Sequence, residues 1–452
     1  MLTTLVERSS LADESKTSDD VGFDETKQRN TISTAIADDR QISELTWRSG
    51  LATAGAACSY FVTVGFLNAF GVFQEYYTST LLHGYSDFQI SWLGSFALFA
   101  FFAGAPAAGI LSDKYGPTTP IACGSVTVLF AIFMISLCKK YYQFFLAQGM
   151  VLGLGMAFIG IPASGMVPRY FARHRALATG ISIGGSSLGG IIWPIIFDRL
   201  FHHDGVSFGW SLRIAGFIQI PLLAFIILSV RLPVPKPSSQ DGMTSEKGAA
   251  TKAEHKSKGI AALKSPAFIL VCSGLFLGYL GFFSPFFYIS TYAVHLGEST
   301  TLAFYLVSIV NGASLVGRIL PGMLADRYGR WNLLMCSAFL AGVCAFCWTA
   351  ATSIPGVVVW SVAYGFSSGA ILSLQLACAT SLAPPESASS LIGITMGSVS
   401  LSGLFGTPIN GAILGRGGYI GLSCFSGGML IICSGFILAA RLSLNKKLIA
   451  VV

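Results

Sequence analysis

The chain has 452 residues, of which 53% are hydrophobic and 11% are charged, and its formal net charge is +7. A water-soluble globular domain carries about 25% charged residues, so this composition excludes a soluble globule and predicts a protein that spans a lipid bilayer. Residues 1–46 are an exception, because they hold ten of the 21 acidic residues and are rich in Ser, Thr and Asp. We expect residues 1–46 to form a disordered N-terminal tail.

Apolar segments long enough to cross a bilayer recur along the rest of the chain. A hydrocarbon core about 30 Å thick needs about 20 apolar residues per helix. The sequence therefore predicts twelve transmembrane helices, near 50–74, 88–111, 119–138, 143–167, 177–198, 209–230, 267–291, 301–324, 332–352, 355–382, 388–413 and 418–440. The polar, lysine-rich stretch after the sixth helix reads as a linker. This gives an N-terminal six-helix bundle at 47–232, a linker at 233–265, a C-terminal six-helix bundle at 266–442 and a tail at 443–452.

Lysine and arginine residues predict the orientation. They gather in the loops that share a side with both termini, including six lysines from Lys236 to Lys264. Because positively charged loops stay in the cytoplasm, both termini and the linker are predicted to be cytoplasmic. We expect a multi-pass protein of the plasma membrane. Topology explains the positive net charge, so no nucleic-acid partner is expected.

Two segments repeat each other in the sequence: GAPAAGILSDKYGP at 104–117 and GRILPGMLADRYGR at 317–330. The same offset of 213 positions aligns 65–73 with 278–286, and the glycines of the fifth helix with those of the eleventh. Two six-helix halves in the same orientation are the architecture of transporters that rock around a site between the halves. The predicted fold is an all-α membrane protein, with twelve transmembrane helices in two pseudo-symmetric bundles.

The motifs GILSDKYGP and GMLADRYGR resemble the loop signature of the major facilitator superfamily, and the chain resembles that superfamily over about 47–442. The resemblance implies that the acidic residue of each motif latches one conformational state, while the glycine allows a tight reversal. Either of two arginines at the end of the fourth helix is expected to pair with Asp113; a solvated turn is the alternative reading. The gating residues so implied are Asp113, Gly116, Asp326, Gly329, Arg169 and Arg173.

Within the superfamily the chain is most similar to the monocarboxylate porter branch found in fungi, through NAFGVFQEYY, RALATGISIGGSSLGGIIWPII and NGASLVGRILPGMLADRYGR. The resemblance implies secondary active or facilitative transport, by alternating access, of a monocarboxylate or weakly acidic metabolite. Lactate-carrying animal members have a lysine in the first helix, where this chain has Asn68. They also have an aspartate one turn before the arginine of the eighth helix, where this chain has Ser314.

Other functions remain open alternatives at this point. An efflux pump for a fungal secondary metabolite and an importer of a neutral heteroaromatic such as a vitamin fit the same architecture. A non-transporting nutrient receptor on the same fold would bind without flux. In every case the partners expected are a small organic substrate and membrane lipid, with the protein acting as a monomer.

Arg318 is the main candidate for substrate binding. It precedes Asp326 by eight residues, so it lies about 12 Å inside the helix end, where a charge costs at least about 2.5–3.5 kcal/mol unless it has a partner or a wet cavity. The aligned position in the first half is Ala105, so the fold itself does not require the arginine. A guanidinium holds a carboxylate in a bidentate manner. The alternative is a latch that donates hydrogen bonds to backbone carbonyls.

Further polar and aromatic residues within the spans could line a central cavity. The aromatic run of the seventh helix would form a wall for a flat or apolar ligand, and Pro285 would break or kink that helix. Each polar residue could instead join helices through hydrogen bonds, and each aromatic one could simply pack. The substrate-binding candidates besides Arg318 are Asn68, Asn311, Tyr279, Phe283, Tyr364, Ser367 and Gln375.

Enzyme chemistry and cofactors are not indicated. The cluster HHD at 202–204 has no matching distant ligand, and the glycine-rich run GISIGGSSLGG lacks the lysine of a phosphate-binding loop. No catalytic residue, metal or cofactor is expected. Proton coupling stays possible, although every acidic residue after the tail falls in a loop or near a helix end, so no dedicated midplane acid is expected.

Overall fold

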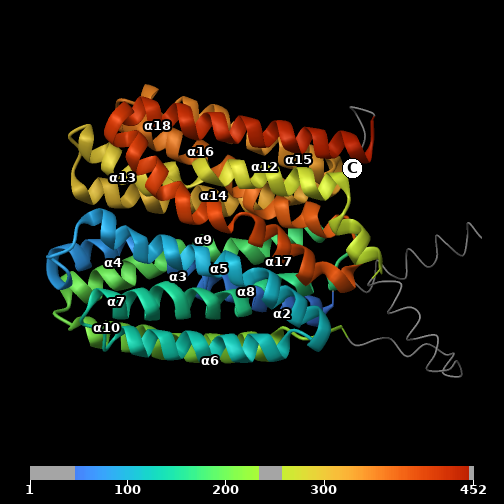
Figure 1. The fold of residues 1–452 in the computed structure, drawn as a ribbon, viewed down its shortest axis with the longest axis horizontal. Helices are drawn as coiled ribbons and strands as arrows, with labels where there is room; N and C mark the ends of the chain where they lie inside the picture. The colour runs from blue at the N-terminus through green and yellow to red at the C-terminus, as the bar shows by residue number, and fades with distance from the viewer. Residues whose placement is uncertain (1–45, 234–256, 447–452) are drawn as a thin grey trace, which may run out of the picture. The chain divides into compact units, whose positions relative to one another are not determined.

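The computed structural model describes residues 46–233 and 257–446, and within them all regular structure is helical (Figure 1). The described residues from Gly50 onward form one compact unit. The predicted tail at 1–45, the linker at 234–256 and the last residues from 447 lie outside the described residues. The end of the predicted linker, 257–263, is helical.

The first half runs from residue 47 to residue 229. Its helices are α2 (Trp47–Val62), α3 (Val64–Leu67), α4 (Phe70–Tyr76), α5 (Asp87–Tyr115), α6 (Thr118–Ile135), α7 (Tyr141–Phe144), α8 (Gly153–Tyr170), α9 (Arg175–Asp198) and α10 (Phe208–Ser229), with π-helical turns at Tyr77–Leu81, Phe145–Leu152 and Arg199–His203.

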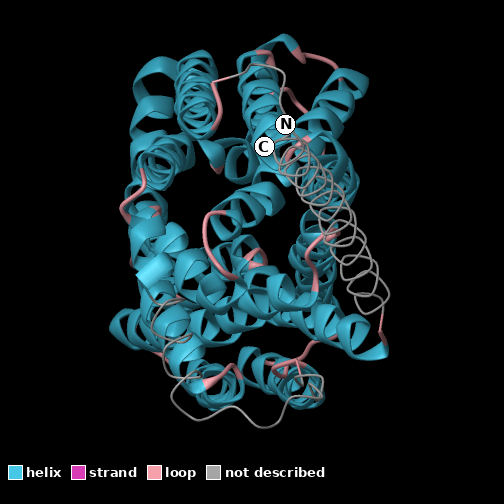
Figure 2. Cartoon of the chain, turned by 90° about the vertical axis from the view of Figure 1, so that its right-hand side faces the viewer, coloured by secondary structure: helices cyan, strands magenta, loops and turns pink. Residues whose placement is uncertain are grey.

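The second half runs from residue 266 to residue 444. Its helices are α12 (Pro266–Phe282), α13 (Ser284–His295), α14 (Thr300–Tyr328), α15 (Arg330–Phe346), α16 (Ile354–Ser381), α17 (Ala388–Ser398) and α18 (Ser400–Leu444), with short 3-10 turns at Trp348–Ala350 and Pro385–Ser387. We call the end of the bundle where α10 ends and α12 begins the linker end; it faces the viewer in Figure 2, where most helices are seen nearly end-on.

The helices account for the twelve predicted spans. Ten helical segments of the described residues are long and apolar enough to cross a membrane. One of them, Pro385–Leu444, contains two spans, because Gly418 leaves the helical conformation with φ 60° and turns the chain back. The twelfth is Arg330–Phe346, which is apolar but has only 17 residues. The boundaries differ most in the first span, which continues to Leu81 instead of 74, and in α15, which ends at Phe346 instead of 352; α5 and α14 continue four residues beyond the predicted ends at 111 and 324.

The first and seventh spans are each interrupted inside the membrane region. The seventh is split between Phe282 and Ser284, next to Pro285, which lies in the first turn of α13. A proline there cannot donate the hydrogen bond that a continuous helix needs. The predicted break at Pro285 is therefore confirmed. The first span is broken at Thr63, whose ψ is −90°, and again before Phe70.

The halves meet mainly through two helix pairs, α5 with α17 and α14 with α9; α5 also contacts α18, α8 contacts α17 and α9 contacts α16. The offset of 213 residues maps the first pair onto the second. A Cβ atom added to Gly109 of α5 would lie 2.2 Å from the carbonyl oxygen of Ser389, and one added to Gly322 of α14 would lie 2.8 Å from that of Ala176. These two contacts are related by the same offset. The sequence repeat therefore corresponds to a repeated contact between the halves.

Candidate substrate site and gates

Asp113, in the last turn of α5, joins the halves at the linker end. Its Oδ1 accepts a hydrogen bond from Nη2 of Arg169 at 2.7 Å, and its Oδ2 accepts one from the backbone nitrogen of Ser390, at the start of α17, also at 2.7 Å. The same Arg169 nitrogen donates to the carbonyl oxygen of Glu386 at 2.9 Å. Of the two arginines considered for Asp113, Arg169 makes the ion pair, while Arg173 is exposed in the connection between α8 and α9.

Asp326, in the last turn of α14, makes the corresponding contact in the other half. Its two oxygens accept hydrogen bonds from the backbone nitrogens of Ala176 and Leu177 at the start of α9, both at 3.0 Å. Arg330 forms an ion pair with Asp326 at 3.1 Å. Each carboxylate satisfies backbone donors at a helix N-terminus, where the helix dipole favours negative charge. Both contacts hold the halves together at the linker end.

The glycines of the repeated motifs end their helices in the left-handed region. Gly116 follows α5 with φ 86°, and Gly329 follows α14 with φ 98°. A side chain is strained in this conformation, and glycine is not. Both glycines therefore allow the chain to reverse within one residue of the helix that carries Asp113 or Asp326.

Arg318 lies on α14 at the boundary between the halves, and its side chain is buried, with 2% exposed. Its Nη1 donates to the carbonyl oxygen of Ile183 on α9 at 2.8 Å and also to the hydroxyl of Ser186. Both contacts use the same nitrogen. The edge formed by Nε and Nη2 has no hydrogen-bond acceptor among the described residues, and Nε is fully buried.

The surroundings of Arg318 carry no acidic counter-ion in the described residues. Ser314, one turn earlier on α14, is fully buried and its hydroxyl has no partner. The hydroxyls of Tyr60 and Tyr279 lie close enough to interact electrostatically with the guanidinium. Tyr60 and Ser186 were not predicted from the sequence, because a hydroxyl within an apolar span does not indicate which helix it will contact.

The backbone around Arg318 is packed as closely as the backbone around Ala105. A Cβ added to Gly180 would lie 2.1 Å from the carbonyl oxygen of Arg318, and one added to Gly393 would lie 2.4 Å from that of Ala105. The two pairs are again related by the offset of 213. The close contact therefore depends on the glycines, and the side chain at position 318 is free to serve another purpose.

The aromatic and polar candidates of the second half form a connected cluster beside Arg318. Nε2 of Gln375 donates to the hydroxyl of Tyr279 at 2.7 Å, whereas Oε1 of Gln375 is buried without a partner. The ring of Tyr279 contacts those of Phe102, Phe282 and Phe283, at 5.9, 5.2 and 5.6 Å between centroids. Phe283 is only partly buried.

Two candidates on α16 donate their hydroxyl hydrogen bonds to backbone carbonyl oxygens of the protein. The hydroxyl of Tyr364 donates to the carbonyl oxygen of Phe282 at 2.7 Å. Ser367 bonds its own helix, through the carbonyl oxygens of Ala363 and Tyr364. Both contacts match the alternative reading of these residues, in which a polar group stabilises the helices.

Asn68 and Asn311 come from different halves and converge on Gly190 of α9. A Cβ added to Gly190 would lie 2.8 Å from Nδ2 of Asn68 and 2.8 Å from Oδ1 of Asn311. Asn311 is buried and bonds the carbonyl oxygen of Val307 at 3.0 Å, whereas Asn68 is exposed. The lack of a side chain at Gly190 thus allows two amides to approach each other.

A family model agrees with this architecture. Residues 51–407 and 322–448 match the model of the Major Facilitator Superfamily. The chain belongs to the Major Facilitator Superfamily. It is a multi-pass membrane transporter with the fold of that superfamily.

Three similar transporters come from fungi. The agnestins efflux protein of Paecilomyces divaricatus is 46% identical over 412 residues, covering 90% of each chain. An MFS-type transporter of Aspergillus fumigatus is 45% identical over 88% of this chain and 93% of its own length. The aspyridones efflux protein of Emericella nidulans is 37% identical over 85% of this chain and 76% of its own length. These names support the superfamily and do not specifically support the monocarboxylate porter branch.

Solved structures share the fold at low sequence identity. The proton:xylose symporter XylE superposes with a TM-score of 0.68 at 15% identity, over 86% of this chain and 95% of its own. The human organic anion transporter MFSD10 gives a TM-score of 0.64 at 14% identity, over 86% and 98%.

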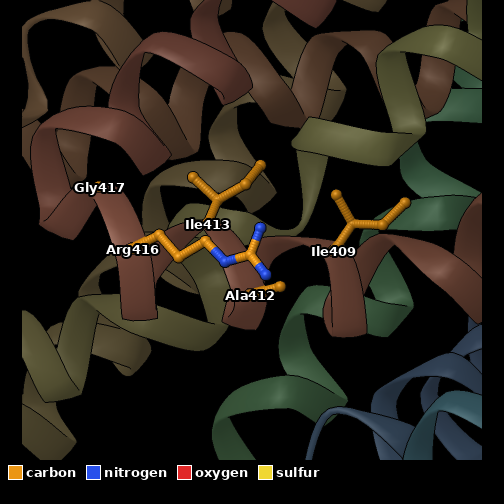
Figure 3. Close-up of a pocket in the computed structure, with 5 residues that line it drawn as sticks. All are labelled: Ile409, Ala412, Ile413, Arg416 and Gly417. Carbon is orange, nitrogen blue, oxygen red and sulfur yellow. The ribbon is translucent and has the colours of Figure 1, made fainter.

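A pocket of about 320 Å³ lies on α18 of this superfamily member, away from the predicted site. Figure 3 shows the guanidinium of Arg416 beside Ile409, Ala412 and Ile413. None of the predicted substrate-binding residues is among the five that line this pocket.

Proposed function

We propose that this transporter exports a small, weakly acidic organic metabolite by alternating access, with Arg318 as the anion site. The observation that carries the proposal is Nε of Arg318, which is buried at the boundary between the halves without a protein acceptor among the described residues, on the edge that it shares with Nη2. This edge is the part of a guanidinium that binds a carboxylate or an enolate in a bidentate manner.

The energetics favour an anionic ligand. A cation inside the membrane costs at least about 2.5–3.5 kcal/mol when it has no partner. The carbonyl oxygen of Ile183 and the hydroxyl of Ser186 offer only partial negative charge. An anion bound at Arg318 would supply the missing charge, and it would favour the conformation that encloses it.

The direction of export is supported by the names of the relatives, two of which are efflux proteins for fungal metabolites. A fungal metabolite with an acidic group and an aromatic or apolar body suits the cluster around Tyr279. We therefore widen the expected substrate class from monocarboxylates to weakly acidic metabolites, which include monocarboxylates.

The transport cycle would open and close the two repeated contacts at the linker end. In the present conformation Asp113 binds the start of α17 and Asp326 binds the start of α9. Opening toward the linker end requires both to break, together with the bond from Arg318 to Ile183. Because that bond joins the two halves next to the anion site, ligand binding and opening would be coupled.

Deletion of the gene tests the proposal. Acidic metabolites should accumulate in the cells and decline in the medium, and the wild-type gene should restore export while the Arg318→Ala variant does not. An unchanged distribution of acidic metabolites between cells and medium would contradict it.

The membrane placement belongs to the same proposal: a monomer in the plasma membrane with both termini and the linker in the cytoplasm. Single cysteines placed in the 236–264 linker of a cysteine-free variant should react with a membrane-impermeant maleimide only after the cells are opened. Labelling in intact cells would show that the linker lies outside the cell and would contradict the predicted topology. Proton coupling, if present, would act through a loop carboxylate or through ionisation of the substrate, because Arg318 has no acidic neighbour in the described residues.

Import of a neutral heteroaromatic is a second candidate, favoured by the packed rings of Tyr279, Phe282 and Phe283. A neutral ligand would not depend on the charge at position 318. Transport that survives Arg318→Ala would support this candidate.

A further inference from the structure

Gln375 is a buried side chain with one satisfied and one unsatisfied polar atom. Only 2% of the residue is exposed. Its Nε2 donates to the hydroxyl of Tyr279 at 2.7 Å. Its Oε1 is enclosed and accepts no hydrogen bond from the residues that the structure describes. Buried acceptors are almost always paired, so an orphaned one at a fixed position indicates a missing donor.

Gln375 lies at the same depth in the bundle as Arg318. A Cβ on Gly369 of α16 would be 2.9 Å from the hydroxyl of Ser314 on α14, which places these two residues at one level. Both helices approach the linker end at their C-termini, since Asp326 and Thr380 bond the start of α9 there. Arg318 is four residues beyond Ser314 and Gln375 is six beyond Gly369. The two side chains thus differ in depth by about 3 Å along the bundle.

The two orphaned atoms are chemically complementary. Nε of Arg318 is a donor without an acceptor, and Oε1 of Gln375 is an acceptor without a donor. Tyr279 contacts Gln375 directly, through its hydroxyl. A single ligand satisfies both atoms if it carries an anionic oxygen for Arg318 and a hydroxyl or N–H group for Gln375.

The rings next to this pair suit a flat ligand. Phe102 on α5 and Phe283 both meet the ring of Tyr279 edge-on, with interplanar angles of 82° and 80°. Edge-on and offset arrangements are the ones that aromatic rings prefer. A further aromatic ring can therefore join this cluster when the halves separate.

We propose that Gln375 determines substrate specificity by accepting a hydrogen bond from a hydroxyl group of the substrate, whose acidic group is bound by Arg318. The substrate class is thus a hydroxylated aromatic acid or the equivalent enol, and this inference rests on the proposed anion site. Methylation or loss of the hydroxyl leaves Oε1 without a donor, and a site built for a hydroxyl rejects such an analogue.

Transport by proteoliposomes tests the inference with benzoate, its 3- and 4-hydroxy derivatives and the matching methoxybenzoates as probes. The wild-type protein should prefer at least one hydroxybenzoate over its methyl ether by about tenfold, the equivalent of one hydrogen bond. Gln375→Leu should abolish this preference while still transporting benzoate. Tyr279→Phe, which removes the hydroxyl that the amide contacts, should reduce the preference to a smaller extent.

Gln219→Leu is the matched control. Gln219 lies on α10, is fully buried, and has no partner for either amide atom among the described residues. Its replacement should leave the hydroxyl preference intact. A loss of the preference in both variants would instead indicate a general effect of removing a buried glutamine.

The outcomes separate the inference from the proposed function. Arg318-dependent transport of the benzoates with equal rates for hydroxy and methoxy forms, or a preference that survives Gln375→Leu, overturns the role of Gln375 and leaves the anion site standing. Failure of the wild-type protein to transport any of the benzoates overturns the anion site and the inference together.

Discussion

Nη1 of Arg318 on α14 donates a hydrogen bond to the carbonyl oxygen of Ile183 on α9, across the boundary between the halves, at 2.8 Å. The sequence offered two readings of this arginine, a latch to backbone carbonyls and an anion site. The geometry allows both at once, because the latch uses Nη1 alone and leaves the Nε and Nη2 edge to a ligand. A bond between the halves beside the proposed anion site is a direct physical route from ligand binding to rocking.

Two replacements of Arg318 test the contributions of its charge and of its bidentate hydrogen-bond geometry separately. Arg318→Ala should lower transport of an anionic substrate by about 100-fold, as expected for a lost charge-assisted hydrogen-bond pair. Arg318→Lys keeps the charge without the bidentate geometry and should retain a small part of the activity. Initial rates in proteoliposomes check both values. Arg213→Ala, which removes an arginine stacked over the ring of Trp210 in α10, is the control and should transport normally.

An acidic residue at position 314 should compete with the substrate. In Ser314→Asp the introduced carboxylate lies one turn from Arg318 and neutralises it, so anion transport should fall at neutral pH. Protonation at lower pH removes that charge, so activity should recover as the pH falls. Ser314→Asn has a similar shape without the charge, and its rate should lack this acid recovery. Flux against pH, for a substrate whose own charge is constant, distinguishes the two variants.

Side chains at the paired glycines should push the halves apart. The Cβ of Gly180→Ala would meet the carbonyl oxygen of Arg318, and that of Gly393→Ala would meet the carbonyl oxygen of Ala105. Both should therefore favour opening at the linker end. The reporter is a cysteine in place of Ser112, which is buried there in the closed form. Its maleimide labelling in a cysteine-free background should accelerate in both variants.

Gly435→Ala is the control for the glycine variants, because a Cβ at this position has no neighbour within 4 Å. Its labelling should equal that of the parent protein. Equal labelling of all three variants would mean that the close contacts at Gly180 and Gly393 do not hold the closed form.

Removal of the latching charges should weaken the closed form in the same way from either half. Asp113→Asn and Asp326→Asn each lose a carboxylate at a helix N-terminus, an effect of about 1 kcal/mol or fivefold in the open fraction. The labelling rate of a cysteine at position 182, which is buried on α9, measures that fraction. Similar effects for the two variants are expected, since the contacts are related by the repeat. An effect confined to one of them would show that a single latch controls opening.

Local patterns in the sequence determined most of the architecture. The number of spans follows from apolar length, and the relation of the halves follows from the offset of 213. The positive φ of Gly116 and Gly329 and the break at Pro285 follow from the backbone preferences of single residues. The depth of Arg318 within its span follows from its distance to the helix end. Apart from the repeat, each of these features depends on residues near one another in the chain.

The tertiary structure decided which of several possible partners each polar group takes. Arg169 and Arg173 are four positions apart, and only the packing of α8 against α5 brings Arg169 to Asp113. Gln375 and Tyr279 are 96 positions apart and Arg318 and Ile183 are 135 apart, so no local pattern connects them. Helix periodicity determines which face of a span is polar. The neighbour of that face depends on how the spans are arranged in the bundle, and that arrangement selects the chemistry of the site.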